Sequence, residues 1–492
     1  MVKRRFKRRA VAGASSAVLM ACMTIGLGVA EARAQVPECQ GFAAEIVAMP
    51  GTPTYGTPER DVIVGTSGRD VIHGLDGDDL ICGLGGNDTI DGGHGSDILV
   101  GDGPSIDQSV TGSGNDTLLG GPGNDILVGD ASSVDQSVAG GGNDTLRGGE
   151  GNDVLVGDSR AASLDASETA SGGGNDRIYG EEGRDQLIGD SETGFGGAAR
   201  GGGADHLDGG AEIDFLVGDS RGSFSGSSSG GGNDRLYGGE ERDQLIGDSS
   251  SGAVGTATGG GSDYLDGAVG NDVLVGDSST GAGTASGGGN DQLVGGEGND
   301  QLVGDSRSQG LGGDTKEAGN DVLLGGPGTA DFLTGDSEYI GNAYGAGGND
   351  LLDLGDDGGE AAIGDHNTRF TNGGTAFGSG NDRIIGGSRN EVLIGDSSVG
   401  VDAETPPTAG NDVLDGRGGN DQMFGDNTDF FSTRTYGTAG GSDTLRGSDG
   451  ADTLTAGPRN DLLDGGADSP DECDGEAGTD TAIRCESTAN IP

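Results

Sequence analysis

The sequence lacks the side chains that build large hydrophobic cores. Among its 492 residues there is no tryptophan, aromatic residues make up 4 %, and hydrophobic residues make up 31 %. Positive charge is scarce as well, since 27 Lys and Arg stand against 82 Asp and Glu and the formal net charge is −55. Such a chain buries too little apolar surface to offset its conformational entropy, and its carboxylates repel one another. We therefore expect folding to require a neutralising cation, and an acidic surface of this density excludes nucleic acid as a partner.

Long apolar runs are absent beyond residue 34, so no later segment is expected to span a membrane. Residues 1–34 resemble a secretory signal peptide, with a basic start at residues 3–9, a mildly apolar stretch at 10–30 and an A-x-A cleavage site at 32–34. The paired arginines leave export by the Sec or the twin-arginine route open. Residues 19–22, which end at Cys22, resemble a lipoprotein cleavage box and leave a lipoprotein as an alternative.

Cysteine is also rare, with five residues in the whole chain. Four of them remain beyond residue 34: Cys39 and Cys82 flank the start of a repeat region, and Cys473 and Cys485 follow its end. In an exported chain this placement predicts one disulfide at each end of the repeats.

The sequence contains no separate catalytic constellation. No Ser/His/Asp or Cys/His set stands outside the repeats, and the four histidines, at positions 73, 94, 206 and 366, are scattered through repeat positions. We expect these histidines to be surface residues and the protein not to be an enzyme.

Glycine, by contrast, is abundant, with 110 residues and without the three-residue period of collagen. The dipeptide Gly-Asp recurs after apolar segments at intervals of about 30 residues, a period typical of solenoids. These Gly-Asp aspartates are Asp102, Asp130, Asp158, Asp190, Asp219, Asp248, Asp277, Asp305, Asp336, Asp365, Asp396 and Asp426.

A shorter period indicates the strands. From Asp61 to Asp97 an aspartate recurs every nine residues, and the middle one of the three residues after it is apolar, which is typical of a short strand with one inward side chain. Further on, two such strands in each unit are separated alternately by a tight Gly-rich turn and by a longer loop. The residues expected to stack inside are Leu118, Leu127, Leu146, Leu155, Ile178, Leu187 and their successors.

The turn sequence Gly-Gly-x-Gly-x-Asp suits a hard cation. Glycine permits positive φ and close backbone approach, so the turn can direct carbonyl oxygens inward, and the aspartate adds a carboxylate. Two turns stacked one coil apart would form a cage of six oxygens, which favours calcium over magnesium.

The nonapeptide is similar to that of the RTX, or haemolysin-type, calcium-binding repeat family, over about residues 61–465. The resemblance implies a parallel β-roll that is folded with calcium and disordered without it. It implies calcium ligands in the strict nonapeptides at Asp70, Asp79, Asp88 and Asp97. On the tight-turn side it implies ligands at Asp125, Asp153, Asp185, Asp214, Asp243, Asp272, Asp300, Asp331, Asp421 and Asp452. On the loop side it implies ligands at Asp116, Asp144, Asp176, Asp205, Asp234, Asp263, Asp291, Asp321, Asp350, Asp382, Asp412, Asp443 and Asp461.

Some units depart from the motif. Glu212 and Glu241 replace a turn glycine, and Glu360 and Glu391 stand where aspartate is expected. Ala362 replaces an inward leucine. Since glutamate is one methylene longer, we expect poor calcium binding on the tight-turn side from about residue 350 to 391.

The Gly-Asp aspartates, among them Asp130, Asp158 and Asp190, admit two interpretations. They could form a second ligand column that faces the Gly-Gly-Gly-Asn-Asp turn across the loop. They could instead begin the loop with an Asx-turn, in which the side chain bonds its own backbone. Stacked uncompensated carboxylates would repel one another, which favours a nearby cation.

The predicted fold is therefore all-β: a right-handed parallel β-roll or β-solenoid of about 12 long coils, each with two short strands, one tight turn and one long loop. The predicted domains are the signal peptide (1–34), an N-terminal leader or cap (35–60), calcium-binding repeats (61–464) and a C-terminal disulfide cap (465–492).

The predicted function is that of an exported protein that folds on binding several calcium ions and serves outside the cell as a structural or adhesive module. The long-loop face is a candidate surface for extracellular polysaccharide or protein. Aromatic residues of the later loops could form that surface or could cover the apolar edge of the rod; they are Tyr339, Tyr344, Phe370, Phe377, Phe430, Phe431 and Tyr436. A polysaccharide lyase or epimerase acting on a β face, or an ice-binding roll, are the alternatives.

Overall fold

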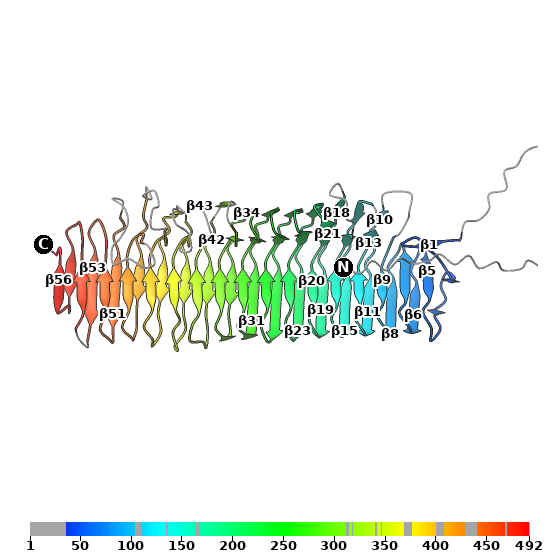
Figure 1. Ribbon diagram of the computed structural model, residues 1–492, viewed down its shortest axis with the longest axis horizontal. Helices are drawn as coiled ribbons and strands as arrows, with labels where there is room; N and C mark the ends of the chain where they lie inside the picture. The colour runs from blue at the N-terminus through cyan, green and yellow to red at the C-terminus, as the bar shows by residue number, and fades with distance from the viewer. Residues whose placement is uncertain are drawn as a thin grey trace, which may run out of the picture. The chain divides into compact units, whose positions relative to one another are not determined.

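The computed structural model describes residues 36–103, 110–133, 136–162, 168–310, 314–316, 318–339, 342–345, 347–368, 376–399, 408–428, 440–467 and 470–491. The predicted signal peptide lies outside these residues. From Pro37 onward the chain forms one unit, a long rod of stacked coils (Figure 1). Within the described residues every regular element is a β-strand, and none is a helix that could cross a membrane.

One long coil contains four short strands. β11 (Thr117–Pro122) leads through the tight turn into β12 (Ile126–Val128), and β13 (Ala131–Ser133) and β14 (Val138–Gly140) follow. Each strand pairs in parallel with its equivalent one coil further on: β11 with β15 (Thr145–Glu150), and β12 with β16 (Val154–Val156). We call the four resulting sheets sheet 1 (β12 and equivalents), sheet 2 (β11), sheet 3 (β13) and sheet 4 (β14). The prediction of an all-β parallel solenoid is confirmed.

The prediction of one irregular long loop per coil was incomplete, because in many coils this segment contains the strands of sheets 3 and 4. Sheet 3 runs from β13 to β42 (Glu338–Tyr339), and sheet 4 from β10 (Val110–Gly112) to β46 (Ala376–Phe377). Adjacent loops lie in register and satisfy each other's backbone groups, and their inward residues are small, such as Ser159 and Ala170. The sequence of the loops gave no strand signal because serine, glycine and alanine have little β-propensity.

The coils shorten at both ends of the rod. Near the N-terminus, β5 (Val62–Thr66), β6 (Val71–Asp76), β7 (Leu80–Leu84), β8 (Thr89–His94) and β9 (Ile98–Val100) belong only to sheets 1 and 2. Near the C-terminus the same two sheets continue through β51 (Thr444–Ser448), β52 (Thr453–Thr455), β53 (Leu462–Gly466), β54 (Glu472–Asp474), β55 (Thr481–Ile483) and β56 (Ser487–Ala489). Each of the eleven intervals between successive Gly-Asp aspartates spans one long coil, so about eleven long coils lie between the ends, in agreement with the prediction of about 12.

Both predicted disulfides are formed. Cys39 of β1 (Glu38–Cys39) bonds Cys82 of β7, and Cys473 of β54 bonds Cys485. The leader strands β3 (Ile46–Val47) and β4 (Thr54–Tyr55) pair with β5 and β6, so the leader extends the stack. Each end of the rod is thus covalently tied to its outermost coils.

The core is a narrow aliphatic ladder that runs the length of the rod. The middle residues of the strands of sheets 1 and 2, such as Leu118 and Leu127, face each other and are fully buried, as predicted. Where Ala362 replaces leucine, Leu354 of the same coil is also part of the core. Each coil contributes only about two large apolar side chains, so burial of apolar surface supplies a limited share of the stability.

Sheet 3 covers part of the outer face of sheet 1. The third residue of several sheet-1 strands, such as Val156 and Ile188, points outward yet is fully buried. Glu192 of β21 (Ser191–Phe195) accepts a hydrogen bond from Gln186 of β20 (Gln186–Ile188) at 3.0 Å, which places sheet 3 beside this face. Tyr339 is buried as well, so it belongs to the cover; the side chains of the other aromatic residues named above lie outside the described residues.

Candidate metal centres

Two columns of aspartates run along the two edges at which sheets 1 and 2 meet. In each column the backbone N–H of one aspartate donates to Oδ1 of the equivalent aspartate one coil later, at 2.6 to 3.1 Å. The tight-turn column contains Asp61, Asp79, Asp97, Asp125, Asp153, Asp185, Asp214, Asp243, Asp272, Asp300, Asp331, Glu391, Asp421, Asp452 and Asp471. The loop-side column contains Asp70, Asp88, Asp116, Asp144, Asp176, Asp205, Asp234, Asp263, Asp291, Asp321, Asp350, Asp382, Asp412, Asp443, Asp461 and Asp480. The structure thus brings together every motif aspartate named from the sequence.

Beyond Asp61 and Asp70 at the N-terminal end, the second oxygen of the column aspartates has no hydrogen-bond donor. Oδ2 of Asp125 and Asp153 in the tight-turn column, and of Asp116 and Asp144 in the loop-side column, is buried and unpaired. A buried, ionised oxygen without a partner carries a large desolvation penalty. Each turn therefore holds a ligand atom that requires a cation or a proton.

Glycine carbonyls converge on the same places. A methyl group on Gly238 would lie 2.6 Å from Oδ2 of Asp243 and 3.0 Å from the carbonyl oxygen of Gly267, one coil on. The equivalent position on Gly295 is 2.6 Å from both Oδ2 of Asp300 and the carbonyl oxygen of Gly325. The donors gathered at each turn are all oxygens from carboxylates and carbonyls, which fits a hard cation such as calcium.

The two glutamates of the tight-turn side behave differently. Glu391 is buried, its N–H donates to Oδ1 of Asp421 at 2.9 Å, and its Oε2 is unpaired, so it occupies the aspartate's place in the column. Glu360 is exposed, and its N–H bonds the carbonyl of Asp331 at 2.8 Å. We therefore expect calcium binding along the tight-turn column to be interrupted at Glu360 alone, which is a narrower region than the stretch from 350 to 391 expected from the sequence.

The turns around Glu212 and Glu241 keep their shape despite the loss of glycine. Both residues adopt a φ of 77°, in the left-handed region that glycine normally occupies. Asp214 and Asp243 consequently retain their places in the tight-turn column.

The Gly-Asp aspartates lie on the loop side, and their carboxylates accept hydrogen bonds from glycines of the Gly-rich turns, not from the residues directly after them. Oδ1 of Asp130 and Asp158 accepts hydrogen bonds from the N–H of Gly114 and Gly142 at 3.1 and 3.0 Å, 16 residues away. These glycines stand two residues before a loop-side aspartate. Of the two interpretations drawn from the sequence, these bonds match the column that faces the turn.

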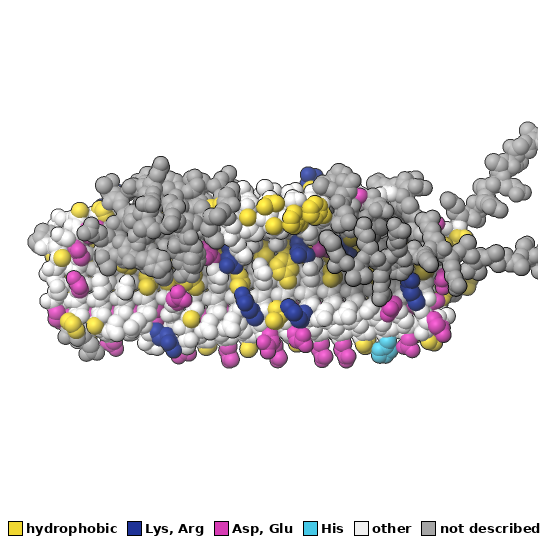
Figure 2. Space-filling model, viewed as in Figure 1, with side chains coloured by type: hydrophobic (Ala, Val, Ile, Leu, Met, Phe, Trp, Pro, Cys, Tyr) yellow, Lys and Arg dark blue, Asp and Glu magenta, His cyan; other side chains and the backbone are white. Residues whose placement is uncertain are grey.

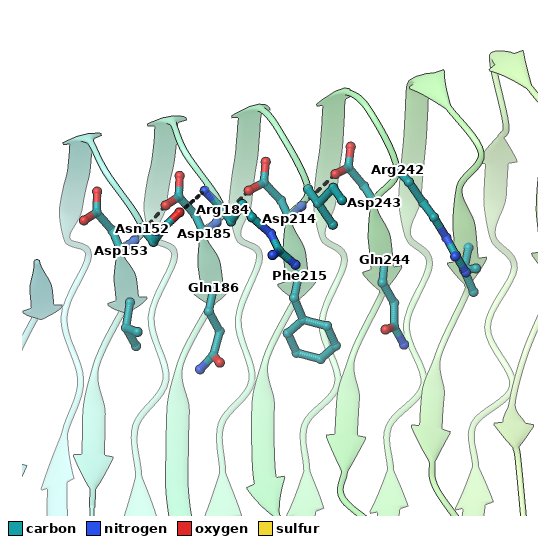
Figure 3. A pocket seen from close by; sticks show the side chains of 13 residues that line it. Asn152, Asp153, Arg184, Asp185, Gln186, Asp214, Phe215, Arg242, Asp243 and Gln244 are labelled. Atoms are coloured by element: carbon teal, nitrogen blue, oxygen red, sulfur yellow. Dashed lines mark hydrogen bonds between the residues drawn. The ribbon is translucent and has the colours of Figure 1, made fainter. Parts of the chain in front are cut away.

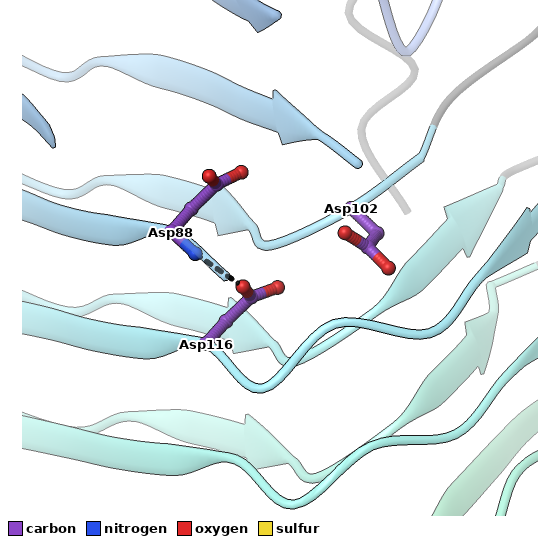
Figure 4. A group of neighbouring side chains, drawn as sticks. All are labelled: Asp88, Asp102 and Asp116. Carbon is purple, nitrogen blue, oxygen red and sulfur yellow. Dashed lines mark hydrogen bonds between the residues drawn. The ribbon is translucent and has the colours of Figure 1, made fainter. Parts of the chain in front are cut away.

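Several Gly-Asp aspartates each approach two loop-side aspartates. Figure 4 shows Asp102 beside Asp88 and Asp116, and oxygens of these three carboxylates lie within 4.8 Å of one another. The same arrangement recurs at Asp116, Asp130 and Asp144; at Asp144, Asp158 and Asp176; at Asp176, Asp190 and Asp205; and at Asp205, Asp219 and Asp234.

Burial raises the pKa of these carboxyls, and their mutual repulsion adds to the effect. The pKa of Asp125 in the tight-turn column rises to about 7, mainly through desolvation. On the loop side desolvation and neighbouring carboxylates raise the pKa of Asp116 to about 8 and of Asp144 to about 10. The larger shifts on the loop side reflect deeper burial together with a third nearby carboxylate.

Asparagines stack outside the loop-side column. Nδ2 of Asn320 donates to Oδ1 of Asn290 at 3.0 Å, and Asn349 and Asn381 extend the series at 2.8 Å each. In the recurrent Asn-Asp pair, the asparagine therefore belongs to an exposed stack of amides and the aspartate to the buried loop-side column.

Three site features were not predicted correctly. Asp471 and Asp480 extend the two columns into the C-terminal segment. The available signal was the spacing, since Asp471 follows Asp461 by ten residues and Asp480 follows Asp471 by nine. His366 is fully buried rather than on the surface, because it occupies the inward position after Gly-Asp that serine fills in most coils. Its Nδ1 lies 3.7 Å from Oδ2 of Asp336, and burial lowers its pKa to about 4.

A groove on the outer face of sheet 1 borders the tight-turn column. Its volume is about 740 Å³, and Figure 3 shows Gln186, Phe215 and Gln244 in a row on successive strands, with Arg184 and Arg242 beside them. Its carboxylates, Asp153, Asp185, Asp214 and Asp243, belong to the tight-turn column. The groove therefore presents amides, guanidinium groups and one aromatic ring.

The convergence of oxygens at Gly238 predicts a selective mutational effect. Gly238→Ala would place a methyl group among the ligand oxygens, so we expect the calcium concentration at half-maximal folding to rise several-fold. Gly68→Ala is the control, because a methyl group there contacts nothing within 4 Å. Circular dichroism during calcium titration measures both, and equal midpoints for the two variants would contradict the assignment.

The raised pKa values predict that, without calcium, the stability of the folded rod depends on pH in an unusual direction. Between about pH 4 and pH 8 the folded rod binds more protons than the unfolded chain, so its stability falls as pH rises. In excess chelator we expect more β signal at pH 4.5 than at pH 8. With calcium the order reverses, because calcium binds the deprotonated carboxylates. More structure at pH 8 than at pH 4.5 in chelator would show that the carboxyls are not protonated in the fold.

Comparison with known families agrees with this geometry. The RTX calcium-binding nonapeptide repeat family matches residues 55–90, 83–103, 102–133, 132–159, 170–194, 201–220, 228–251, 257–279, 286–306, 378–398, 408–429 and 438–470, more than half of the chain. The stretch from 307 to 377, which includes Glu360, is not matched. No curated protein matched the chain. Stacked aspartates, the parallel β-solenoid and these repeats together show that the chain belongs to the RTX calcium-binding nonapeptide repeat family.

Proposed function

We propose that this protein is exported, folds when calcium binds along its turns, and acts outside the cell as a structural or adhesive module. The observation that carries the proposal is the pair of carboxylate columns, in which one buried oxygen is unpaired in coil after coil. The narrow apolar core offers little to offset the desolvation penalty of these buried oxygens, so cation binding has to supply folding free energy.

The ligands proposed for calcium are the motif aspartates named from the sequence, joined by Asp471, Asp480 and Glu391. The bound ion would neutralise the carboxylates of two adjacent coils and cross-link them through their oxygens. Extracellular calcium, at millimolar concentration, suits the dissociation constants of about 10⁻⁴–10⁻³ M typical of extracellular modules.

Export is supported by three features of the chain. Residues 1–34 resemble a signal peptide, both disulfides require an oxidising compartment, and RTX repeats are typical of exported proteins. In a calcium-poor cytosol the chain would stay unfolded, which suits passage across a membrane.

Circular dichroism with and without chelator tests the folding step. At pH 7.5 we expect β structure in 5 mM calcium and loss of most of it in excess chelator. Restored calcium should recover the signal, whereas magnesium at the same concentration should recover less. An unchanged β signal in chelator at this pH would show that calcium does not drive folding.

An adhesive role is supported by the groove on sheet 1. The ring of Phe215 suits the apolar face of a sugar, the amides of Gln186 and Gln244 suit hydroxyl groups, and Arg184 and Arg242 suit carboxylates. We therefore propose an acidic polysaccharide as the partner, at this groove rather than at the long-loop face. Since the groove's carboxylates belong to the tight-turn column, its composition suits binding better than catalysis.

Substitution in the groove tests the adhesive role. Phe215→Ala and Arg242→Ala should each weaken retardation of the protein in gels that contain a polyuronate by at least fivefold. Arg446→Ala, on the opposite sheet, is the control and should change nothing. A neutral glucan should retard none of the proteins, and equal retardation of all variants by polyuronate would place adhesion elsewhere.

A further inference from the structure

The loop side of the rod differs from the tight-turn side by one carboxylate per coil. On the tight-turn side each coil supplies one aspartate to the column, for example Asp185 or Asp214. On the loop side the same coils supply a turn aspartate and a Gly-Asp aspartate, for example Asp176 and Asp190. The second carboxylate lies between two consecutive turn carboxylates, as Figure 4 shows for Asp102.

In the triads of Asp130, Asp158 and Asp190 the oxygens divide their roles in the same way. Oδ1 of Asp190 accepts a hydrogen bond from the N–H of Gly174 at 3.2 Å, and Oδ1 of Asp205 accepts one from the N–H of Asp176 at 2.6 Å. Oδ2 of both residues is buried and has no hydrogen-bond partner. Asp190 is completely buried, so its unpaired oxygen is directed into the triad with no access to bulk solvent.

The arrangement balances charge for a divalent ion. Each turn aspartate is shared between the triads above and below it: Asp205 belongs to the triad of Asp190 and to that of Asp219. One coil therefore contributes one shared turn carboxylate and one Gly-Asp carboxylate, a charge of −2 for each site. A single divalent cation per coil neutralises the column along its whole length, whereas on the tight-turn side one divalent ion per coil would exceed the available negative charge.

We propose that each Gly-Asp aspartate adds a third carboxylate to a calcium site in the loop-side row, with one ion per coil bound between it and two turn aspartates. The row rests on the proposed function, that calcium binds along the turns. It binds calcium more tightly than the tight-turn row, because calcium affinity in proteins rises with the number of charged ligands and with site rigidity. Since β13, β17 (Ser159–Ala161) and their equivalents begin directly after the Gly-Asp aspartates, these ions also anchor sheets 3 and 4 to the rod.

Calcium counting in paired variants tests the proposal. Equilibrium dialysis of the full chain with radioactive calcium should show two classes of ion, the tighter one saturating at least tenfold below the other. The double variant Asp190→Asn and Asp219→Asn should lose two ions from the tighter class. The matched variant Asp185→Asn and Asp214→Asn, in the tight-turn column of the same coils, should keep the tighter class complete.

Several outcomes would overturn the loop-side row. If the Asp190→Asn and Asp219→Asn variant keeps every tight ion while the wild type still folds with calcium, the Gly-Asp aspartates are not calcium ligands and the proposed function stands. If the wild type binds no calcium, both fall. Should the double variant fail to fold, anomalous difference maps of calcium-grown wild-type crystals decide, because the proposal requires a peak between Asp205, Asp219 and Asp234. Peaks at the tight turns alone would exclude it.

Discussion

The buried turn carboxylate, held by one oxygen and unpaired at the other, is the constraint on which the rest of the structure depends. Oδ1 accepts the backbone N–H of the coil before it and so joins adjacent coils. Oδ2 is left in a dry, oxygen-lined site. Repeated at the strand spacing of about 4.8 Å, this arrangement is repulsive unless a cation or a proton is present. The fold and the cation are therefore parts of one equilibrium.

This constraint explains the composition of the chain. Glycine recurs where a side chain would displace a ligand oxygen, as at Gly238, and aspartate recurs where a carboxylate must end the turn. Large apolar residues are needed at the two inward positions of each coil and at the outer position of sheet 1 that sheet 3 covers, so tryptophan and most aromatic residues are dispensable. Serine and alanine fill the inward positions of sheets 3 and 4 because adjacent loops lie close together.

The two edges of the rod have different tasks. The tight-turn edge joins sheets 1 and 2 through a short turn that tolerates variation, as Glu212, Glu241 and Glu391 show. In the coil of Glu360 the tight-turn column has no buried carboxylate, because Glu360 is exposed. On the loop-side edge the series of buried Gly-Asp aspartates continues through the same coil. A cation row on the loop side would thus remain continuous where the tight-turn row is broken, which would maintain the stack of coils at that point.

The sequence by itself determined the coil, the inward ladder, the turn aspartates and the pairing of the cysteines. Each of these depends on a local pattern of strict period: an apolar residue such as Leu127 between outward neighbours, or Asp125 at the end of a glycine turn. Only the tertiary structure decided where the loops go and what Asp130 faces. Its partner Gly114 lies 16 residues away, and the strands after it form through pairing with neighbouring loops. Such contacts depend on the stacking of coils, which no single repeat specifies, because a loop of serine and glycine has no backbone preference until an equal loop lies beside it.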